Sequence, residues 1–362
     1  MNSMERITTD DIADLARGAA VLGTGGGGDP YIGQLMALEA VESKGPVTLA
    51  TVADLPDDAL ILPVALMGAP TVMIEKLPSV EQFVGAVTSL GQFLGITPTH
   101  IACMEAGGVN SSIPVAAAAY LGLPLIDADF MGRAYPELQM VTATLFGVQA
   151  TPMSITDDKG NAGIFSTVSN RWAEALARVV TVEMGANSIV SLYPMNGKQV
   201  KQAAVAGTLT LCVRLGRAIN QARAEHVSPV AAVTDILGAR VIHTGKIVDI
   251  DRRTTAGFAR GEAKLAGLDA DAGKTVVLSF QNENVIAERD GVVLATTPDL
   301  LICLDTDTGE PITTEWLRFG QRIALIAAPC DARWHTPEGI ALVGPRYFGY
   351  DTDPVRWNQV DL

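Results

Sequence analysis

The chain has 362 residues and a net charge of −14, and 48% of its residues are hydrophobic while 18% are charged. This length exceeds the usual limit for one hydrophobic core, so we expect two domains. The acidic chain has no cluster of Lys and Arg to hold a phosphate backbone, which excludes a nucleic-acid partner. The large apolar share predicts a compact protein whose buried surface includes a homo-oligomer interface.

The N-terminal segment, residues 1–11, is polar and acidic. A secretory signal would need a basic start and an apolar run, so we expect no export. No uninterrupted apolar stretch reaches the ~20 residues that span a bilayer, so we expect no membrane partner. The four cysteines lie far apart and predict neither disulfides nor a zinc knuckle. These features are typical of a protein of the reducing cytoplasm.

Helices and short apolar strands alternate over the first part of the chain. Helices are predicted at 9–20, 30–43, 79–94 and 113–120. Strands are predicted at 47–52, 59–66, 100–104 and 123–126. Short apolar strands separated by helices are typical of a mostly parallel sheet that is buried on both faces. We therefore predict an N-terminal α/β domain at residues 1–168, with three α/β/α layers.

Between the first two helices lies the run Gly23-Thr-Gly-Gly-Gly-Gly-Asp-Pro30. Glycine amides can converge on a ligand, and Asp29 and Pro30 predict the cap and first residue of a helix. Such a helix N-terminus favours an anionic or oxygen-rich group. The candidate substrate-binding residues in this run are Gly25, Gly26, Gly27, Gly28 and Asp29.

The same run satisfies the G-x-G-x-x-G pattern of nucleotide-binding α/β units. That motif should follow a strand, whereas residues 10–22 are predicted as a helix. Asp54 also lies too far along the chain for the ribose contact, which should come about twenty residues after the motif. A dinucleotide-dependent oxidoreductase stays an alternative interpretation. A P-loop is excluded here because no Gly-Lys-Ser/Thr follows.

Three predicted strands end in unusual segments: Met67-Gly-Ala-Pro70, Glu105-Ala-Gly-Gly-Val-Asn-Ser111 and Asp127-Ala-Asp-Phe-Met-Gly-Arg-Ala-Tyr-Pro-Glu137. Ligands of open α/β sheets bind beyond the carboxyl ends of the strands, so these segments and the glycine run could line one cleft. Carboxylates that lie close together acquire different proton affinities, which supplies an acid and a base. The candidate catalytic residues are Glu105, Asp127 and Asp129, and Arg133 could pair with one of them or with a substrate carboxylate.

Each candidate also has a structural interpretation. A carboxylate at a strand end often caps a helix or anchors a loop. Gly107, Gly108 and Asn110 fit either substrate binding or a strand-to-helix connection that is capped by Asn110 or Ser111.

A divalent metal is an open alternative as cofactor. Glu105, Asp127 and Asp129 together would suit a hard cation such as Mg²⁺. The four histidines are isolated in the sequence, and His335 lies five residues after Cys330 in a predicted loop, where a chance pair is one interpretation.

The second part of the chain, residues 169–362, has a different pattern of predicted elements and forms the predicted C-terminal domain. Helices are predicted within about 170–224, and short β-rich runs separated by turn signals follow over about 239–345. Asp290-Gly291 between two alternating runs is a strong signal for a tight hairpin. These runs predict a small antiparallel β-barrel.

Four motifs in the same order resemble the S-methyl thiohydantoin desulfurase-like family over nearly the whole chain. They are Gly23-Thr-Gly-Gly-Gly-Gly-Asp-Pro30, Glu105-Ala-Gly-Gly-Val-Asn110, Asp127-Ala-Asp-Phe-Met-Gly-Arg-Ala-Tyr-Pro-Glu-Leu138 and Gly344-Pro-Arg-Tyr-Phe-Gly-Tyr-Asp351. The resemblance implies a three-layer α/β domain followed by a domain with a β-barrel. It also implies work on hydantoin-like rings and an association with hydantoinase- or oxoprolinase-type enzymes. It implies no catalytic residue set.

These features predict a catabolic enzyme that hydrolyses or desulfurises a hydantoin-type cyclic amide. The Gly25 to Gly28 amides would stabilise the negative charge that develops on the ring oxygen or sulfur. Asp127 or Asp129 would activate water, Glu105 would pass a proton to the leaving group, and Arg133 would orient the substrate. A non-catalytic, ligand-binding partner of a hydantoinase- or oxoprolinase-type enzyme is the alternative from a different class.

Overall fold

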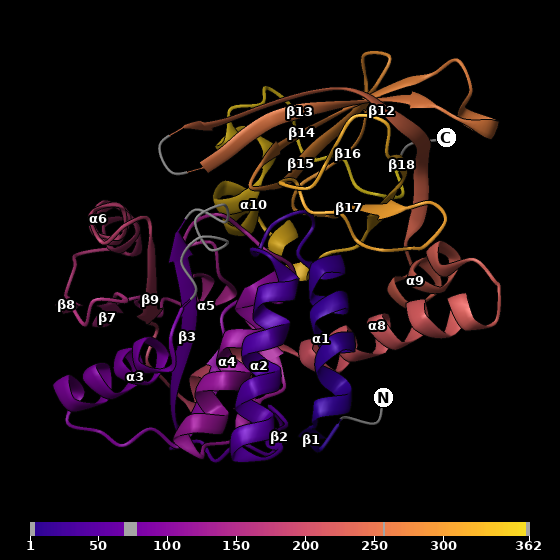
Figure 1. The fold of residues 1–362 in the computed structure, drawn as a ribbon. Coiled ribbons are helices and arrows are strands. Elements are labelled where there is room, and N and C mark those ends of the chain that lie inside the picture. The colour runs from indigo at the N-terminus through magenta and orange to yellow at the C-terminus, as the bar shows by residue number, and fades with distance from the viewer. Residues whose placement is uncertain (1–3, 69–77, 256–257, 360–362) are drawn as a thin grey trace.

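The computed structural model describes residues 4–68, 78–255 and 258–359. A helix-rich part with a large sheet forms one half of the molecule, and a β-rich part built from later segments lies against it (Figure 1). The fold is mixed α/β, as the sequence predicts. Among the residues just given, no helix is both long enough and apolar enough to cross a membrane.

Within the described residues, the first half contains a nine-stranded sheet in the order β1-β2-β5-β4-β3-β9-β7-β8, with β10 paired to β3. The strands are β1 (Arg6–Ile7), β2 (Val47–Ala50), β3 (Leu60–Gly68), β4 (His100–Cys103), β5 (Leu125–Ile126), β7 (Met153–Thr156), β8 (Ala162–Phe165), β9 (Asn187–Ser191) and β10 (Met195–Asn196). The neighbours β2, β5, β4 and β3 pair in parallel. The mostly parallel arrangement predicted for the sheet holds for this central block alone, because the segment after residue 150 adds β7, β8 and β9 in antiparallel pairs. The sheet therefore continues past residue 168.

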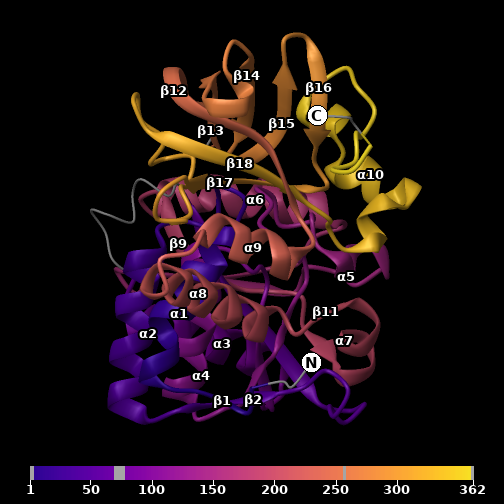
Figure 2. The same cartoon turned by 90° about the vertical axis from the view of Figure 1, so that its right-hand side faces the viewer.

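The helices of this half are α1 (Thr9–Leu22), α2 (Pro30–Lys44), α3 (Val80–Leu94), α4 (Gly108–Leu121), α5 (Thr142–Leu145), α6 (Asn170–Glu183), α7 (Gly197–Ala203), α8 (Thr208–Ala224) and α9 (Pro229–Leu237). Helix α1 packs on α8 and α2 packs on α4, as Figures 1 and 2 show from two sides. Strand β3 is buried on both faces: Leu62 and Val64 join one apolar cluster, and Ile61 and Ala65 join the other. Burial on both faces is what its continuous apolar run predicts.

Two local differences from the predicted elements bear on the site. Helix α4 begins at Gly108 with Gly107 as its N-cap, so Asn110 and Ser111 lie in its first turn and do not cap it. The predicted helical region up to residue 224 is interrupted after α7. There, β11 (Val205–Ala206) pairs with β6 (Ala128–Asp129) before α8 begins.

In the second half, the described strands form a seven-stranded antiparallel sheet in the order β16-β15-β14-β13-β12-β18-β17. They are β12 (Arg240–Thr255), β13 (Phe258–Gly267), β14 (Thr275–Gln281), β15 (Glu283–Arg289), β16 (Val292–Thr296), β17 (Leu300–Asp305) and β18 (Arg322–Ala328). Short helices η2 (Asp269–Asp271), η3 (Ala332–His335), α10 (Pro337–Val343) and η4 (Pro345–Phe348) complete this half. The hairpin predicted at Asp290-Gly291 is confirmed, since it joins β15 to β16 with φ of 51° and 85°.

This sheet is curled into a half-barrel (Figures 1 and 2). The predicted small barrel is therefore correct in its antiparallel pairing and curvature, but in the described residues β16 and β17 are the ends of the sheet. The turn that connects them instead contacts the first half, because the carbonyls of Pro298 and Asp299 accept hydrogen bonds from Arg133.

Candidate functional site

The glycine-rich loop joins two helices, α1 and α2. Its backbone needs glycine, since Gly25, Gly27 and Gly28 have φ of 96°, 85° and 81°. Asp29 ends the loop as a helix cap, because its Oδ1 accepts the Tyr31 N–H at 2.8 Å. The loop therefore follows a helix, whereas a dinucleotide fingerprint follows a strand.

The glycine loop and the turn before α4 are in direct backbone contact. A Cβ on Gly27 would lie 2.5 Å from the carbonyl carbon of Gly107, and one on Gly108 would lie 2.2 Å from the Gly28 oxygen. Side chains at these positions would force the two segments apart. The two glycine motifs, about 80 residues apart in sequence, thus form one layer of bare backbone.

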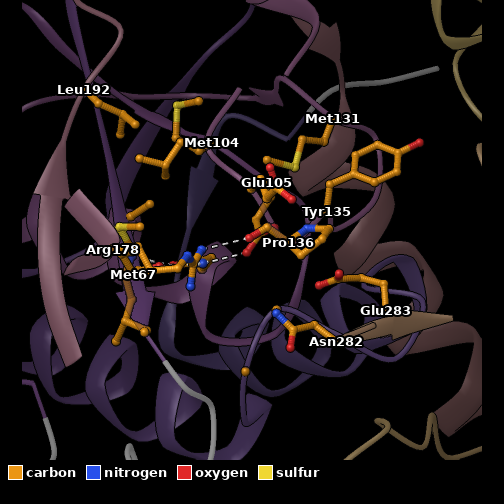
Figure 3. A pocket seen from close by; sticks show the side chains of 18 residues that line it. Met67, Met104, Glu105, Met131, Tyr135, Pro136, Arg178, Leu192, Asn282 and Glu283 are labelled. Carbon is orange, nitrogen blue, oxygen red and sulfur yellow. Dashed lines mark hydrogen bonds between the residues drawn. The ribbon is translucent and has the colours of Figure 1, made fainter. Parts of the chain in front are cut away.

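Beside this layer lies a cavity of about 80 Å³ between the two halves of the molecule (Figure 3). Its walls come from the glycine loop, the ends of β3 and β4, the segment after β6, helix α6 and the turn between β14 and β15. The lining residues are Gly27, Gly28, Ala65, Leu66, Met67, Gly68, Met104, Glu105, Asn110, Met131, Tyr135, Pro136, Glu137, Leu138, Arg178, Leu192, Asn282 and Glu283.

Several sequence-predicted residues meet at this cavity. Gly27, Gly28, Glu105 and Asn110 line it, together with Met67 and Gly68 from the first unusual strand end. Ala69 and Pro70 of that strand end lie outside the described residues. Gly25 and Gly26 lie beside the cavity, against the second half: the Gly25 carbonyl accepts the Thr314 N–H at 2.8 Å, and Gly26 faces the Glu283 side chain.

Glu105 is the buried acid at the end of β4, with 6% of its surface exposed. Its Oε1 accepts a hydrogen bond from Asn110 Nδ2 at 2.5 Å, and Asn110 is itself held by the backbone N–H and carbonyl of Leu66. Burial raises the pKa of Glu105 to about 7, although the bonds from Asn110 and from the Tyr135 N–H favour the charged form. Its proton can therefore come off or on at neutral pH.

Glu283 is the second buried acid of the cavity, and it is not among the residues predicted from the sequence. It follows Asn282, whose φ of 57° makes the sharp turn between β14 and β15. Glu283 is 4% exposed, and its Oε2 has no hydrogen-bond partner in the described part of the chain. Burial, and next the facing charge of Glu105, hold the pKa of Glu283 well above its usual range. A polar Asn-Glu pair between two apolar β runs was the available signal.

Figure 3 shows the carboxyl group of Glu283 turned toward the middle of the cavity, with Glu105 on the adjoining wall. Apolar groups of Met67, Met104 and Leu192 complete the surface. A third acid of the lining, Glu137, is only half-buried and accepts hydrogen bonds from Gln139 and Tyr347. The site thus combines two buried acids of unequal proton affinity with an apolar lining.

A cation closes one end of the same cavity. Arg178 of α6 pairs with Glu174, donates from Nη2 to the Pro136 carbonyl at 3.0 Å and stacks over Phe258 at 4.4 Å. Its partners fix the guanidinium in place at the cavity wall.

Asp127 and Asp129 lie in the same region but do not line the cavity. Asp127 accepts the N–H and the Oγ1–H of Thr210 at 3.0 and 2.6 Å, which anchors the start of α8. Asp129 is fully buried and accepts the N–H groups of Ala106 and Gly132 at 2.7 and 2.9 Å. Burial raises the pKa of Asp129 to about 7, and those N–H groups oppose the shift. Both carboxylates hold backbone turns in place.

Arg133 is also outside the cavity and is 1% exposed. All five of its N–H groups donate within the protein, to the carbonyls of Ala134, Asn284, Pro298 and Asp299 and to Thr24 Oγ1. It ties the glycine loop to the second half of the molecule.

Metal-ligand atoms do not gather at the three carboxylates predicted from the sequence. Among the described residues, Glu105, Asp127 and Asp129 form no cluster of metal-ligand atoms, and the group of three that does is Asp299, Cys330 and His335.

Two family models match the chain: S-Me-THD-like, N-terminal domain, over residues 10–167, and S-Me-THD-like, C-terminal domain, over residues 168–356. The fold is similar to the crystal structure of a protein from Chromobacterium violaceum, with a TM-score of 0.78 and 21% identity over 97% of this chain and 99% of that chain. No curated protein matches. The family models together cover nearly all of the sequence, and the chain belongs to the S-Me-THD-like family.

Proposed function

We propose that this protein is an enzyme that hydrolyses or desulfurises a hydantoin-type or thiohydantoin-type cyclic amide. The single observation that carries the proposal is the pair of buried acids, Glu105 and Glu283, at one cavity. Membership of the S-Me-THD-like family supports a hydantoin-related substrate.

The two acids have unequal surroundings, which gives each a role. Glu105 receives hydrogen bonds that favour its charged form, so it is the base. Glu283 has an unpartnered oxygen in an apolar setting, so it keeps its proton and is the acid. This proposal replaces the roles expected for Asp127 and Asp129 from sequence, because their oxygens are held by Thr210 and by backbone N–H groups.

For an S-methylated thiohydantoin, a water oxygen bonds to the ring carbon and the carbon–sulfur bond breaks. Glu105 takes a proton from that water, and Glu283 gives its proton to the departing methanethiolate. The products are the hydantoin and methanethiol. For a hydantoin, which carries no S-methyl group, the water oxygen bonds to a ring carbonyl carbon and the carbon–nitrogen bond breaks. The ring nitrogen then receives the proton from Glu283. Afterwards Glu105 holds a proton and Glu283 is charged, so the proton returns to Glu283 through water before the next cycle.

Donors at the glycine loop suit the charge that develops during this reaction. The backbone of Gly27 and Gly28 lines the cavity, and Asn282 presents a side-chain amide whose Oδ1 is engaged by the Ala259 N–H at 2.8 Å. Hydrogen-bond donors fixed at the site of developing negative charge lower the barrier without reorganising.

The size of the cavity favours a compact ring. Its volume of about 80 Å³ is smaller than the roughly 150 Å³ of an engineered cavity that binds benzene. Side chains of the cavity wall must therefore move slightly when a substrate ring binds. A dinucleotide would need far more space, and Glu283 fills the position in front of Gly26 that a pyrophosphate would need. Both features count against the oxidoreductase interpretation.

The test is turnover by the purified chain of S-methylated thiohydantoins and hydantoins, followed by mass spectrometry of the ring and a thiol reagent for methanethiol. We expect Glu105→Gln and Glu283→Gln each to lower kcat by about 100-fold or more. Asp157→Asn, which removes a buried carboxylate outside the cavity, is the matched control and should leave kcat unchanged. If the wild-type chain binds such rings without turning them over, a ligand-binding partner of a hydantoinase- or oxoprolinase-type enzyme replaces this proposal.

A further inference from the structure

Three residues with metal-ligand side chains converge in the second half of the molecule, and none of them lines the cavity. Asp299 lies between β16 and β17, Cys330 comes two residues after the end of β18, and His335 ends η3. One donor atom from each lies within 4.8 Å of the others. Three separate segments therefore deliver a carboxylate, a thiol and an imidazole to one point.

The carboxylate at this point is oriented by the backbone around it. Asp299 Oδ2 accepts the Trp357 N–H at 2.9 Å, and Oδ1 accepts the Cys330 N–H at 3.3 Å. Oδ1 also contacts His335 Nε2 at 2.9 Å. Bonds of this kind, which hold a ligand in position from behind, accompany most metal sites in proteins.

A nucleophilic cysteine is the competing interpretation of the same three residues. In such a triad the imidazole must lie between the thiol and the carboxylate. Here the Cys330 thiol donates to the Asp331 carbonyl at 3.4 Å, and the His335 Nε2 contacts Asp299, so the imidazole does not bridge the thiol and the carboxylate. A thiolate there would be repelled by Asp299 unless a cation lay between the two charges. The arrangement therefore fits a metal better than a nucleophile.

Access and donor chemistry agree with a cation. The Asp299 side chain is 1% exposed and the His335 side chain is 14% exposed, so one side of the group is open to solvent. Thiolate, imidazole and carboxylate are the ligands that Zn²⁺ takes in proteins, and three protein ligands leave a fourth position for water.

We propose that Asp299, Cys330 and His335 form a binding site for a transition-metal ion of the Zn²⁺ type. On binding, the Cys330 sulfur loses its proton to solvent and forms the metal–sulfur bond, and water takes the fourth position. The ion joins the segment after β18 and η3 to the turn between β16 and β17, whose Asp299 carbonyl accepts from Arg133 at 2.7 Å. Metal binding therefore stabilises the junction between the two halves.

The test is titration of the chelator-treated, full-length protein with Co²⁺, which reports thiolate ligation by a charge-transfer absorption band. We expect one equivalent to bind with such a band, Zn²⁺ to displace it, and Zn²⁺ to raise the unfolding temperature. Cys330→Ser should abolish the band. Loss of a partner behind a ligand costs about 10–100-fold in affinity, so loss of a ligand in His335→Gln should cost more than that.

The exposed His226 supplies the matched control, because His226→Asn should bind Co²⁺ like the wild type. The proposal is overturned if wild type binds less than one equivalent, if no thiolate band forms, or if the band survives in Cys330→Ser. If Cys330→Ser does not fold, His335→Gln and the Zn²⁺-dependent shift in unfolding temperature decide the question.

Discussion

Arg133 donates from Nη2 to the Oγ1 of Thr24 at 2.8 Å, which joins the loop after β6 to the first residue of the glycine loop with positive φ. Thr24 in turn accepts the Asn284 N–H through its carbonyl at 2.8 Å. Asn284 follows Glu283 in β15, so this chain of bonds places the second acid of the cavity against the glycine loop.

Replacement of Arg133 by Lys should therefore destabilise the protein strongly. A lysine cannot reproduce the planar fork, so buried carbonyls of Asn284, Pro298 and Asp299 would lose partners. Each unpaired buried acceptor costs about 1–3 kcal/mol, and we expect a loss of about 3–5 kcal/mol in the free energy of unfolding, measured with urea. Arg346→Lys, at an exposed ion pair with Asp351, is the control and should leave the urea midpoint unchanged. Equal midpoints for the two variants would contradict this role.

Four carboxyl variants separate the acids of the cavity from those that anchor turns. Asp127→Asn should lower the free energy of unfolding by about 1–3 kcal/mol, because the hydrogen bonds from the Thr210 N–H and Oγ1–H weaken. Asp129→Asn weakens the bonds from the Ala106 and Gly132 N–H groups but also removes a buried acid whose pKa is raised, so its loss of stability at neutral pH should be smaller. The kcat of the folded fraction should stay within a few fold. Glu105→Gln and Glu283→Gln should show the reverse, with a large loss of kcat and no loss of stability at neutral pH. A loss of turnover in Asp127→Asn with unchanged unfolding would return the catalytic role to that residue.

The pH dependence of kcat/KM should be bell-shaped. Activity needs Glu105 charged, so it should rise as the pH passes about 7. It also needs Glu283 protonated, so it should fall at higher pH, because the pKa of Glu283 is well above its usual range. Because the two acids interact, the two limbs report apparent pKa values of the pair and not of either residue alone. In Glu283→Gln the falling limb should disappear, and a profile with both limbs intact would exclude Glu283 as the acid.

Stability should depend on pH through Glu105 in a direction that can be measured. Its pKa rises from 4.5 to about 7 on folding, so its favourable contribution is complete below about pH 4.5 and is lost as the pH rises through about 7. The full loss is about 3 kcal/mol. The free energy of unfolding of Glu105→Gln, measured with urea, should therefore increase relative to that of wild type as the pH rises from about 5 to about 8.

Asp157 provides the control for that titration, because its pKa is lowered in the folded protein. Its contribution is present above its unfolded value and is lost only as the pH falls. The difference between wild type and Asp157→Asn should therefore be flat over the same range. A flat difference for Glu105→Gln as well would show that Glu105 is not held protonated by burial.

The central parallel strands, the Asp290-Gly291 hairpin and the meeting of two glycine motifs follow from local patterns in the sequence. Glu105 and Asn110 could be placed at the cavity because the carboxyl ends of parallel strands share one edge. Glu283 could not, since its position depends on how a β-sheet from the other half packs on the glycine loop. Asp129 and Arg133 are predicted in the site itself for the same reason as Glu105, but they lie outside the cavity. Their side-chain direction depends on partners such as Ala106 and Thr24, which lie far away in sequence.

Gly26 gives the sharpest test of the link between the glycine loop and the second acid. A Cβ at Gly26 would lie 2.0 Å from Glu283 Oε1, the movable end of a side chain, so Gly26→Ala should displace that carboxyl at a small cost in stability. Gly27→Ala should instead unfold the loop, because its Cβ would meet the Gly107 backbone at 2.5 Å and its φ is 85°. We expect kcat of Gly26→Ala to fall nearly as far as that of Glu283→Gln. In the double variant the effects should not add, since both changes remove the same group. Additive losses would show that Gly26 acts on turnover without Glu283, and the proposed acid would then have to be sought elsewhere on the cavity wall.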